Sequence, residues 1–225
     1  MTLGTPRVHR RVTGSTSIDA RELAIAGAPH GTLVTAAEQR EGRGRQGRSW
    51  IAPPGAALLC SLVLHDPPPL LPLAAAVAVA ELVGPRARIK WPNDVLLDRR
   101  KVSGILVEGR PQERWAVLGI GVNVAVDPGD LPEELRETAG TLGLGHDAIE
   151  PSLARLLELL EHRLGAAPAE ILDAWRKHDA LLGSPITWNG GSGVAAGVDE
   201  RGRLRARLGD GSETTLDAGE IHLLA

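Results

Sequence analysis

A ten-residue segment from Glu41 to Trp50, with the sequence EGRGRQGRSW, constrains this chain more than any other part. Three glycines alternate with three arginines, and no apolar residue appears before Trp50. Glycine lets the backbone approach a ligand closely, and arginine binds carboxylate and phosphate groups through paired hydrogen bonds. Ordering so polar a segment is costly. The segment is therefore predicted to be a surface loop that closes over an anionic ligand.

The composition is that of a globular chain of one or two domains. The chain has 225 residues, 43% of them hydrophobic, which is enough for a sizeable core. Lys and Arg number 25 against 28 Asp and Glu, and the net charge of −3 argues against a protein that binds polyanions over its whole surface. Phe and Tyr are absent, so the core must be built from Leu, Val, Ile and Ala.

Cysteine content and the apolar runs predict a cytoplasmic protein. The single cysteine, Cys60, lies in the apolar run of residues 56–64 and is expected to be a buried thiol in a reducing compartment. The N-terminus is polar and basic, unlike a signal peptide, and the apolar run of residues 70–83 is too short to span a bilayer. No membrane partner is expected.

Apolar spacing predicts an α+β fold with a mixed β-sheet and helices. Helices are expected from residue 15, 16 or 17 to about residue 27, and over residues 70–83, 152–164 and 169–181. Strands are expected over residues 31–39, 56–65, 86–91, 95–97, 101–108 and 115–126, with a hairpin turn at residues 98–100.

The pattern changes after Gly183, where glycine turns separate short alternating runs. These runs predict strands over residues 184–188, 193–198, 203–208, 214–217 and 220–223, which form a small β-barrel. The domain boundary is placed near Leu182, giving a main domain of residues 1–182 and a C-terminal domain of residues 183–225. A core of that size needs help from a neighbour to be stable.

The glycine-arginine loop has three other interpretations. Residues 42–47 match the dinucleotide-binding pattern GxGxxG, but two prolines and a strand follow where that motif needs a helix. An RG-rich arm for nucleic acid has the right residues, but no aromatic side chains interleave it. A solvated loop without a ligand is the usual interpretation of a run of charges.

A second polar cluster, Lys90-Trp91-Pro92-Asn93-Asp94, argues against the solvated loop. It lies at the end of a predicted strand and supplies a cation, an amide and a carboxylate within five residues. An amide can bind an adenine edge, and a carboxylate suits Mg²⁺ or a positively charged nucleophile. A second ammonium group follows in residues 101–106, and a second amide in residues 119–123.

Taken in order, these segments resemble the biotin protein ligases over nearly the whole chain. The matching motifs are Ser-Thr at residues 15–16, QxxGRGRxGRxW at 39–50, KWPND at 90–94, KxxGILxE at 101–108 and GxGxN at 119–123. The tail resembles the family's SH3-like C-terminal domain at residues 198–204 and 219–221. The resemblance implies a biotin/lipoate ligase-like catalytic domain that binds biotin and ATP, followed by an SH3-like β-barrel.

The resemblance also implies a function, that of a biotin–[biotin carboxyl-carrier protein] ligase. Members of the family activate biotin with MgATP to biotinyl-5′-AMP, release pyrophosphate, and transfer biotin to one lysine of a biotin carboxyl carrier domain. The substrates would be ATP and biotin, with Mg²⁺ as the metal ion. The partner would be a carrier domain of a biotin-dependent carboxylase such as acetyl-CoA carboxylase. No nucleic-acid partner is expected, and a monomer and a homodimer both remain open.

The matched motifs assign expected roles to individual residues. The catalytic residues would be Arg45, Lys101, Asp94 and Lys90, with Arg45 and Lys101 nearest the biotin carboxylate and the α-phosphate. Biotin would be bound by Ser15, Thr16, Gln39, Gly42, Arg43, Gly104 and Leu106. ATP or the adenylate would be bound by Arg43, Arg45, Arg48, Trp50, Lys90, Asn93, Lys101 and Asn123. Asp94 would hold Mg²⁺ or orient the acceptor lysine, and this choice stays open.

The chain departs from the family's common pattern at two positions. Ser17 stands where asparagine is common, and Glu41 where a small residue often precedes GRGR. Only fourteen residues precede Ser15, so a winged-helix DNA-binding domain and a repressor function are not expected. The alternatives are a lipoate or octanoate ligase of the same fold and a non-catalytic nucleotide- or nucleic-acid-binding module. Trp91, Trp115 and Trp175 are expected to pack in the core.

Overall fold

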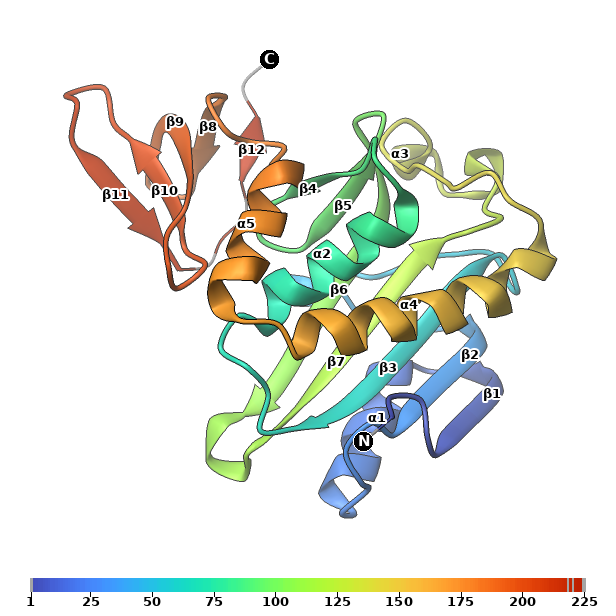
Figure 1. Ribbon diagram of the computed structural model, residues 1–225. Coiled ribbons are helices and arrows are strands. Elements are labelled where there is room, and N and C mark those ends of the chain that lie inside the picture. The colour runs from blue at the N-terminus through green and yellow to red at the C-terminus, as the bar shows by residue number, and fades with distance from the viewer. Residues whose placement is uncertain (1, 218, 220, 224–225) are drawn as a thin grey trace.

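A mixed β-sheet forms the centre of the molecule (Figure 1). The computed structural model describes residues 2–217, 219 and 221–223. Within residues 7–123, seven strands pair in the order β1-β2-β3-β7-β6-β5-β4. Only β1 and β2 pair in parallel in this sheet, and the other neighbours are antiparallel. The strands are β1 Arg7–Thr13, β2 Leu33–Gln39, β3 Ala57–His65, β4 Arg88–Lys90, β5 Asp94–Leu97, β6 Arg100–Arg110 and β7 Trp115–Asn123.

Helices cover both faces of this sheet. Helix α1, Thr16–Ile25, packs Ala20 and Ala24 against Val34, Val63 and Val117 of β2, β3 and β7. The opposite face is covered by α2, Leu71–Val83, and α4, Ile149–Leu164, which lie in front of the sheet in Figure 1. Helix α5, Pro168–His178, follows α4, and the short α3 spans Glu133–Arg136.

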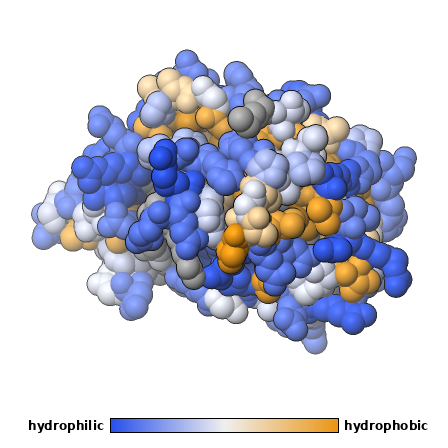
Figure 2. Space-filling view, turned by 90° about the horizontal axis from the view of Figure 1, so that it is seen from below, coloured by the Kyte–Doolittle hydropathy of each residue, from blue (hydrophilic) through white to orange (hydrophobic). Residues whose placement is uncertain are grey.

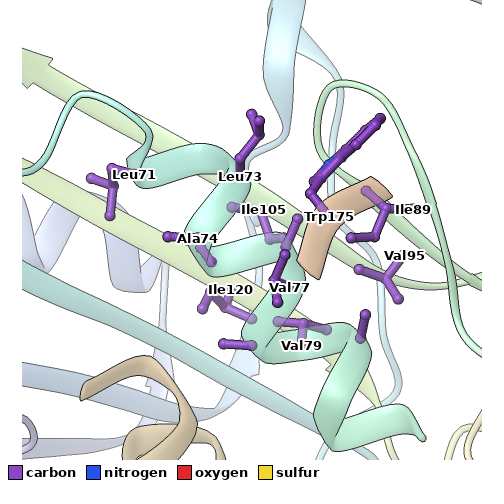
Figure 3. Packing of buried hydrophobic residues seen from close by; sticks show 14 of the residues in the cluster. Leu71, Leu73, Ala74, Val77, Val79, Ile89, Val95, Ile105, Ile120 and Trp175 are labelled. Atoms are coloured by element: carbon purple, nitrogen blue, oxygen red, sulfur yellow. The ribbon is translucent and has the colours of Figure 1, made fainter. Parts of the chain in front are cut away.

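Helix α2 forms the centre of the larger core. Its residues from Leu73 to Ala80 are all buried, and five of these eight are alanines. In Figure 3, Ala74 and Val77 lie beside Ile105 and Ile120 of the sheet, and Trp175 of α5 lies on another side of the helix. Because alanine adds little volume, the helix packs closely on the strands, and larger residues of the sheet and of α5 fill the remaining space.

A second sheet forms in the tail and packs onto the same core. Its described strands pair in the order β11-β10-β9-β8-β12. They are β8 Pro185–Trp188, β9 Gly191–Val198, β10 Leu204–Arg207, β11 Glu213–Leu216 and β12 His222–Leu223. Buried residues of this sheet, Ile186, Val198 and Leu204 among them, belong to the same hydrophobic cluster as α2. The small sheet is therefore stabilised by its neighbour.

A buried hydrogen bond ties the tail to the larger sheet. The indole Nε1 of Trp91 donates to the carbonyl oxygen of Gly202 at 2.9 Å. Gly202 has a φ of +76°, and a Cβ atom there would lie 3.1 to 3.2 Å from Leu73 and Leu70 of the α2 region. Glycine is thus favoured by the left-handed backbone conformation, and a Cβ atom would also crowd the two leucines.

The α+β class and most elements confirm the sequence-based predictions. The predicted hairpin turn joins β5 to β6 through Asp98 and Arg99, whose φ values of 49° and 67° are those of a tight two-residue turn. Trp91, Trp115, Trp175 and Cys60 are buried as expected. Strand β1 and helix α3 were not predicted, and α5 ends at His178 rather than at residue 181. Of the strand expected over residues 220–223, residue 220 lies outside the described residues.

The surface is mainly hydrophilic, with hydrophobic residues gathered in small patches in the view of Figure 2. No helix among the described residues combines the length and the hydropathy that crossing a membrane requires.

Replacing Trp91 with phenylalanine tests the link between the tail and the larger sheet. Trp91→Phe leaves the buried Gly202 carbonyl without its donor, so we expect a loss of about 1–3 kcal/mol in the free energy of unfolding beyond that of the packing change. The control is Trp175→Phe, because the Trp175 indole is equally buried and its Nε1 has no partner among the described residues. Equal losses in urea titrations of the two variants would contradict the role of the hydrogen bond.

Candidate functional site

One cavity brings together the polar motifs that the sequence analysis singled out. It is bordered by the glycine-arginine loop, the Lys90–Asp94 segment and residues of β6 and β7. Two residues of the tail, Gly219 and Ile221, also line it. The expected site residues on its wall are Thr16, Gln39, Arg43, Arg45, Arg48, Trp50, Lys90, Asn93, Asp94, Lys101, Gly104 and Leu106.

The glycine-arginine loop is folded back on itself. Arg43 and Ser49 form a β-bridge, Gly44 N donates to Arg48 O at 2.7 Å, and Trp50 N donates to Gly42 O at 2.8 Å. A short 3₁₀ turn, Arg45–Gly47, forms the tip. The loop thus satisfies several of its own backbone groups, although its tip remains polar and largely exposed.

Trp50 anchors the loop to the sheet. Its indole lies on a pair of glycines, Gly104 of β6 and Gly121 of β7, which are directly opposite each other in the two strands. A Cβ atom at Gly121 would lie 2.5 Å from the indole, and one at Gly104 would lie 3.0 Å from it. Lys101 Nζ is 5.7 Å from the ring centroid, which is a cation–π contact. The loop therefore has a packing residue that its sequence alone does not reveal.

Positive charge dominates the cavity. Its described lining includes five cations, Arg43, Arg45, Arg48, Lys90 and Lys101, and one carboxylate, Asp94. Lys101 Nζ pairs with Asp94 Oδ1 at 2.7 Å. Lys90 has no ion-pair partner within the described part of the chain. The excess of cations fits an anionic ligand.

Two arginines of the loop are held in different ways. Arg43 forms an ion pair with Glu108, at 2.9 Å between Nη2 and Oε1. Arg45 is partly buried and donates from Nη1 to Asn93 Oδ1 at 3.3 Å, while Asn93 Nδ2 donates to the Ile105 carbonyl at 2.9 Å. Burial lowers the pKa of Arg45, an effect that Arg48 reinforces and Asp94 opposes. A desolvated guanidinium of this kind is stabilised when an anion binds beside it.

Polar groups at the start of α1, together with Gln39 of β2, form a further part of the cavity wall. The backbone N–H and the hydroxyl of Thr16 both donate to Gln39 Oε1, at 2.7 and 3.0 Å. Ser15 is 1% exposed, and its hydroxyl has no partner among the described residues. Ser15 is the N-cap of α1 but makes no side-chain cap hydrogen bond, so its hydroxyl is not used by the helix.

Three expected site residues lie outside the cavity lining. They are Ser15, Gly42 and Asn123. Gly42 accepts the Trp50 N–H and so shapes the loop. Asn123 is buried and donates from Nδ2 to Gly140 O at 2.9 Å, and its Oδ1 has no partner in the described part of the chain.

The structure brings to the site several residues to which the sequence analysis assigned no role. Ser61 and Ser17 extend the hydroxyl network around Thr16. Gly119 gives that network room, because a Cβ there would lie 2.6 Å from Ser17 Oγ. For Gly219 and Ile221, the only indication in the sequence was the resemblance of the tail to the family's C-terminal domain.

The described residues offer little for an independent metal site. No group of three or more His, Cys, Asp or Glu side chains among them is arranged to hold a metal ion. Asp94 is the single carboxylate on the described cavity wall. One carboxylate fits Mg²⁺ that is bound mainly by the phosphates of a ligand, which is a common arrangement for this ion.

Comparisons with known proteins point to one family. The model of the biotin/lipoate A/B protein ligase family matches residues 9–125, and that of the biotin protein ligase C-terminal domain matches residues 182–224. The bifunctional ligase/repressor BirA of Bacillus subtilis is 35% identical, over 93% of this chain and 71% of that protein. The biotin--[acetyl-CoA-carboxylase] ligase of Paracoccus denitrificans is 36% identical, over 93% of this chain and 97% of that protein. The biotin protein ligase from Aquifex aeolicus in complex with biotin and ATP has a TM-score of 0.81 and 25% identity, covering 98% and 99% of the two chains.

Adding a methyl group at Gly121 tests the anchoring of the loop. The new Cβ of Gly121→Ala would displace the Trp50 indole, and such overpacking costs about 1–3 kcal/mol. We therefore expect trypsin to cleave at Arg43, Arg45 or Arg48 at least about 5-fold faster. Gly209→Ala is the control, since nothing lies within 4 Å of a Cβ there. Unchanged cleavage in Gly121→Ala would show that Trp50 does not hold the loop.

Proposed function

The chain belongs to the biotin protein ligase family, and from that premise we propose a two-step reaction. In the first step the biotin carboxylate attacks the α-phosphorus of ATP, forming biotinyl-5′-AMP and releasing pyrophosphate. In the second step the ε-amine of a lysine on a biotin carboxyl carrier domain attacks the acyl carbon, and AMP leaves. The observation that carries this proposal is a single cavity lined by five cations together with a cluster of hydroxyl and amide groups.

The cations offset the charge of the first step. Two anions, the biotin carboxylate and the triphosphate, must approach within bonding distance, and charge develops on the α-phosphate. Preorganised cations stabilise that charge most effectively where water is excluded. We assign this role chiefly to Arg45 and Lys101, with Arg48 and Lys90 binding the phosphates. Arg43, which is paired with Glu108, would serve the ligand mainly through the loop backbone.

This hydroxyl and amide part of the cavity suits the ureido ring of biotin. Such a ring needs matched donors and acceptors within a mostly apolar pocket. Thr16, Gln39 and the unpartnered Ser15 hydroxyl supply the polar groups, and Leu106 supplies apolar surface. Gly104 leaves room for the Trp50 indole, which we propose forms a wall of the nucleotide pocket.

The two asparagines and Asp94 are proposed to have supporting roles. Asn93 holds Arg45 and is proposed to orient it toward the α-phosphate. Asn123 keeps an unpartnered amide oxygen for the nucleotide side of the site. Asp94 is proposed to contact Mg²⁺ or to orient the acceptor lysine after its ion pair with Lys101 opens. Bound Mg²⁺ would shield the phosphate charge.

We propose that closure of the glycine-arginine loop protects the adenylate. An acyl-adenylate is a reactive mixed anhydride, and a closed loop excludes the water that would hydrolyse it. The polar tip and the Trp50 anchor support a loop that is attached to the sheet at one end and mobile at the other.

The same proposal assigns a role to each of the two domains and a protein partner to the chain. Residues 1–182 would form the catalytic domain and residues 183–225 the SH3-like domain, which contributes Gly219 and Ile221 to the site. The carrier domain of a carboxylase would be the protein partner, in the cytoplasm.

Transfer of biotin to a carrier domain is the direct test. The protein, ATP, Mg²⁺ and a purified biotin carboxyl carrier domain are incubated with biotin or, in parallel, with lipoate. We expect ATP-dependent biotinylation of one lysine and no lipoylation. Transfer of lipoate alone would favour a lipoate ligase, and absence of both products would contradict a ligase.

Replacing Arg45 with glycine tests retention of the adenylate. Loss of the partly buried cation is expected to let biotinyl-AMP escape at least about 10-fold faster, which corresponds to about 1.4 kcal/mol of lost stabilisation. Free adenylate is measured by chromatography, and lysines of an unrelated protein should become biotinylated. The control Gln46→Gly adds the same backbone freedom beside Arg45 without removing charge. Equal retention by Arg45→Gly and wild type would refute this role.

Loop closure also predicts that the bound adenylate protects the loop from proteolysis. Biotinyl-AMP should slow tryptic cleavage within residues 41–55 by about 10-fold or more, since the ligand orders the arginines that trypsin cuts. Biotin and ATP are added together to generate the adenylate, and AMP alone serves as the control. The same cleavage rate with and without the adenylate would count against loop closure.

A further inference from the structure

A chain of buried hydroxyl groups runs beneath the hydroxyl and amide part of the cavity wall. Ser61 of β3 is fully buried and does not line the cavity itself. Its hydroxyl lies 2.9 Å from Thr16 Oγ1 and 3.2 Å from Ser17 Oγ. Thr16 and Ser17, at the start of α1, are both part of the cavity wall. Ser61 therefore touches two lining residues from behind.

The directions of these hydrogen bonds follow from counting protons. The atom of Gln39 that meets the Thr16 N–H must be its amide oxygen, because an N–H only donates. The Thr16 hydroxyl donates to the same oxygen, so its single proton is used and it must accept from Ser61. The Ser61 proton is then used as well, and Ser17 must donate to Ser61. The chain runs in one direction, from Ser17 through Ser61 and Thr16 to Gln39.

This direction decides what the cavity wall offers to a ligand. With its oxygen occupied, Gln39 presents its Nε2 amide protons as donors. With its proton occupied, Ser17 presents only lone pairs, as an acceptor. A cyclic urea carries one carbonyl acceptor flanked by N–H donors, so it complements a wall that has donors at one point and an acceptor at another.

We propose that Ser61 is a positioning residue for the ureido group of biotin, which it does not contact. It fixes the Thr16 and Ser17 hydroxyls in one orientation and so sets the donor and acceptor pattern of the wall. This inference rests on the proposed function. It assigns ligand selectivity to a side chain in the middle of β3, whose other residues before His65 are apolar.

Removal of the Ser61 hydroxyl breaks the chain at its centre. In Ser61→Ala, the Thr16 oxygen loses its donor and the Ser17 proton is free to turn toward the cavity, where it would meet a ligand N–H. We expect the KM for biotin to rise about 10-fold, the consequence of one lost buried hydrogen bond. The KM for ATP and kcat at saturating biotin are expected to stay within about 2-fold. A general loss of structure would instead alter all three constants.

Ser103→Ala is the matched control. Ser103 is also fully buried in the sheet, on β6, and its hydroxyl has no partner among the described residues. Both variants are assayed by biotin-dependent exchange of pyrophosphate into ATP, after urea titration has verified folding. A Ser17→Ala variant and the Ser17→Ala/Ser61→Ala double variant complete a double-mutant cycle. The KM of the double variant for biotin should be about the same as that of either single variant, because both substitutions break the same chain of hydrogen bonds.

The outcomes separate this inference from the proposed function. An inactive wild type would overturn the proposed function. An active wild type with an unchanged biotin KM in Ser61→Ala would overturn the positioning role alone. Equal rises in the KM for biotin and for ATP, or an equal effect of Ser103→Ala, would also overturn it, since each would indicate a merely structural residue.

Discussion

The contact between Trp50 and the cross-strand glycines Gly104 and Gly121 is the interaction on which the site depends. It attaches a loop of glycine and arginine, which has little else to pack with, to the paired strands β6 and β7 of the sheet. Side chains larger than hydrogen at either glycine would occupy the space of the indole. The contact brings Arg45 to Asn93 and Lys101 over the indole ring. The loop, the Lys90–Asp94 segment and β6 together therefore form one wall of the cavity.

Charge balance explains how so cationic a cavity is tolerated. Without a ligand, Asp94 pairs with Lys101 and Glu108 pairs with Arg43, so part of the positive charge is neutralised within the protein. Arg45 is not neutralised in this way, because burial disfavours its charge and its hydrogen-bond partner is a neutral amide. Such a group gains most from an anionic ligand. This is the physical basis on which Arg45 is proposed to bind the adenylate.

The sequence predicts those parts of the site that are dense runs of polar residues, and it misses those that depend on distant pairing. The loop, Lys90–Asp94 and the segment from Lys101 follow from local composition. Strand β1 was missed because Val8 and Val12 are its only apolar residues at the exposed edge of the sheet. Ser61 acts through α1, 45 residues away from it in sequence, and the Trp91–Gly202 bond joins residues 111 apart. No local pattern contains either contact.

The central claim is that the cavity forms an adenylate from biotin and ATP, and biotin-dependent exchange of labelled pyrophosphate into ATP measures that step without any carrier protein. Exchange should appear when biotin is added and remain at background with lipoate. It reports on Arg45, Lys101 and the polar wall together, because each is proposed to act in forming the adenylate. Exchange that is absent with biotin, or equally fast with lipoate, would contradict the account.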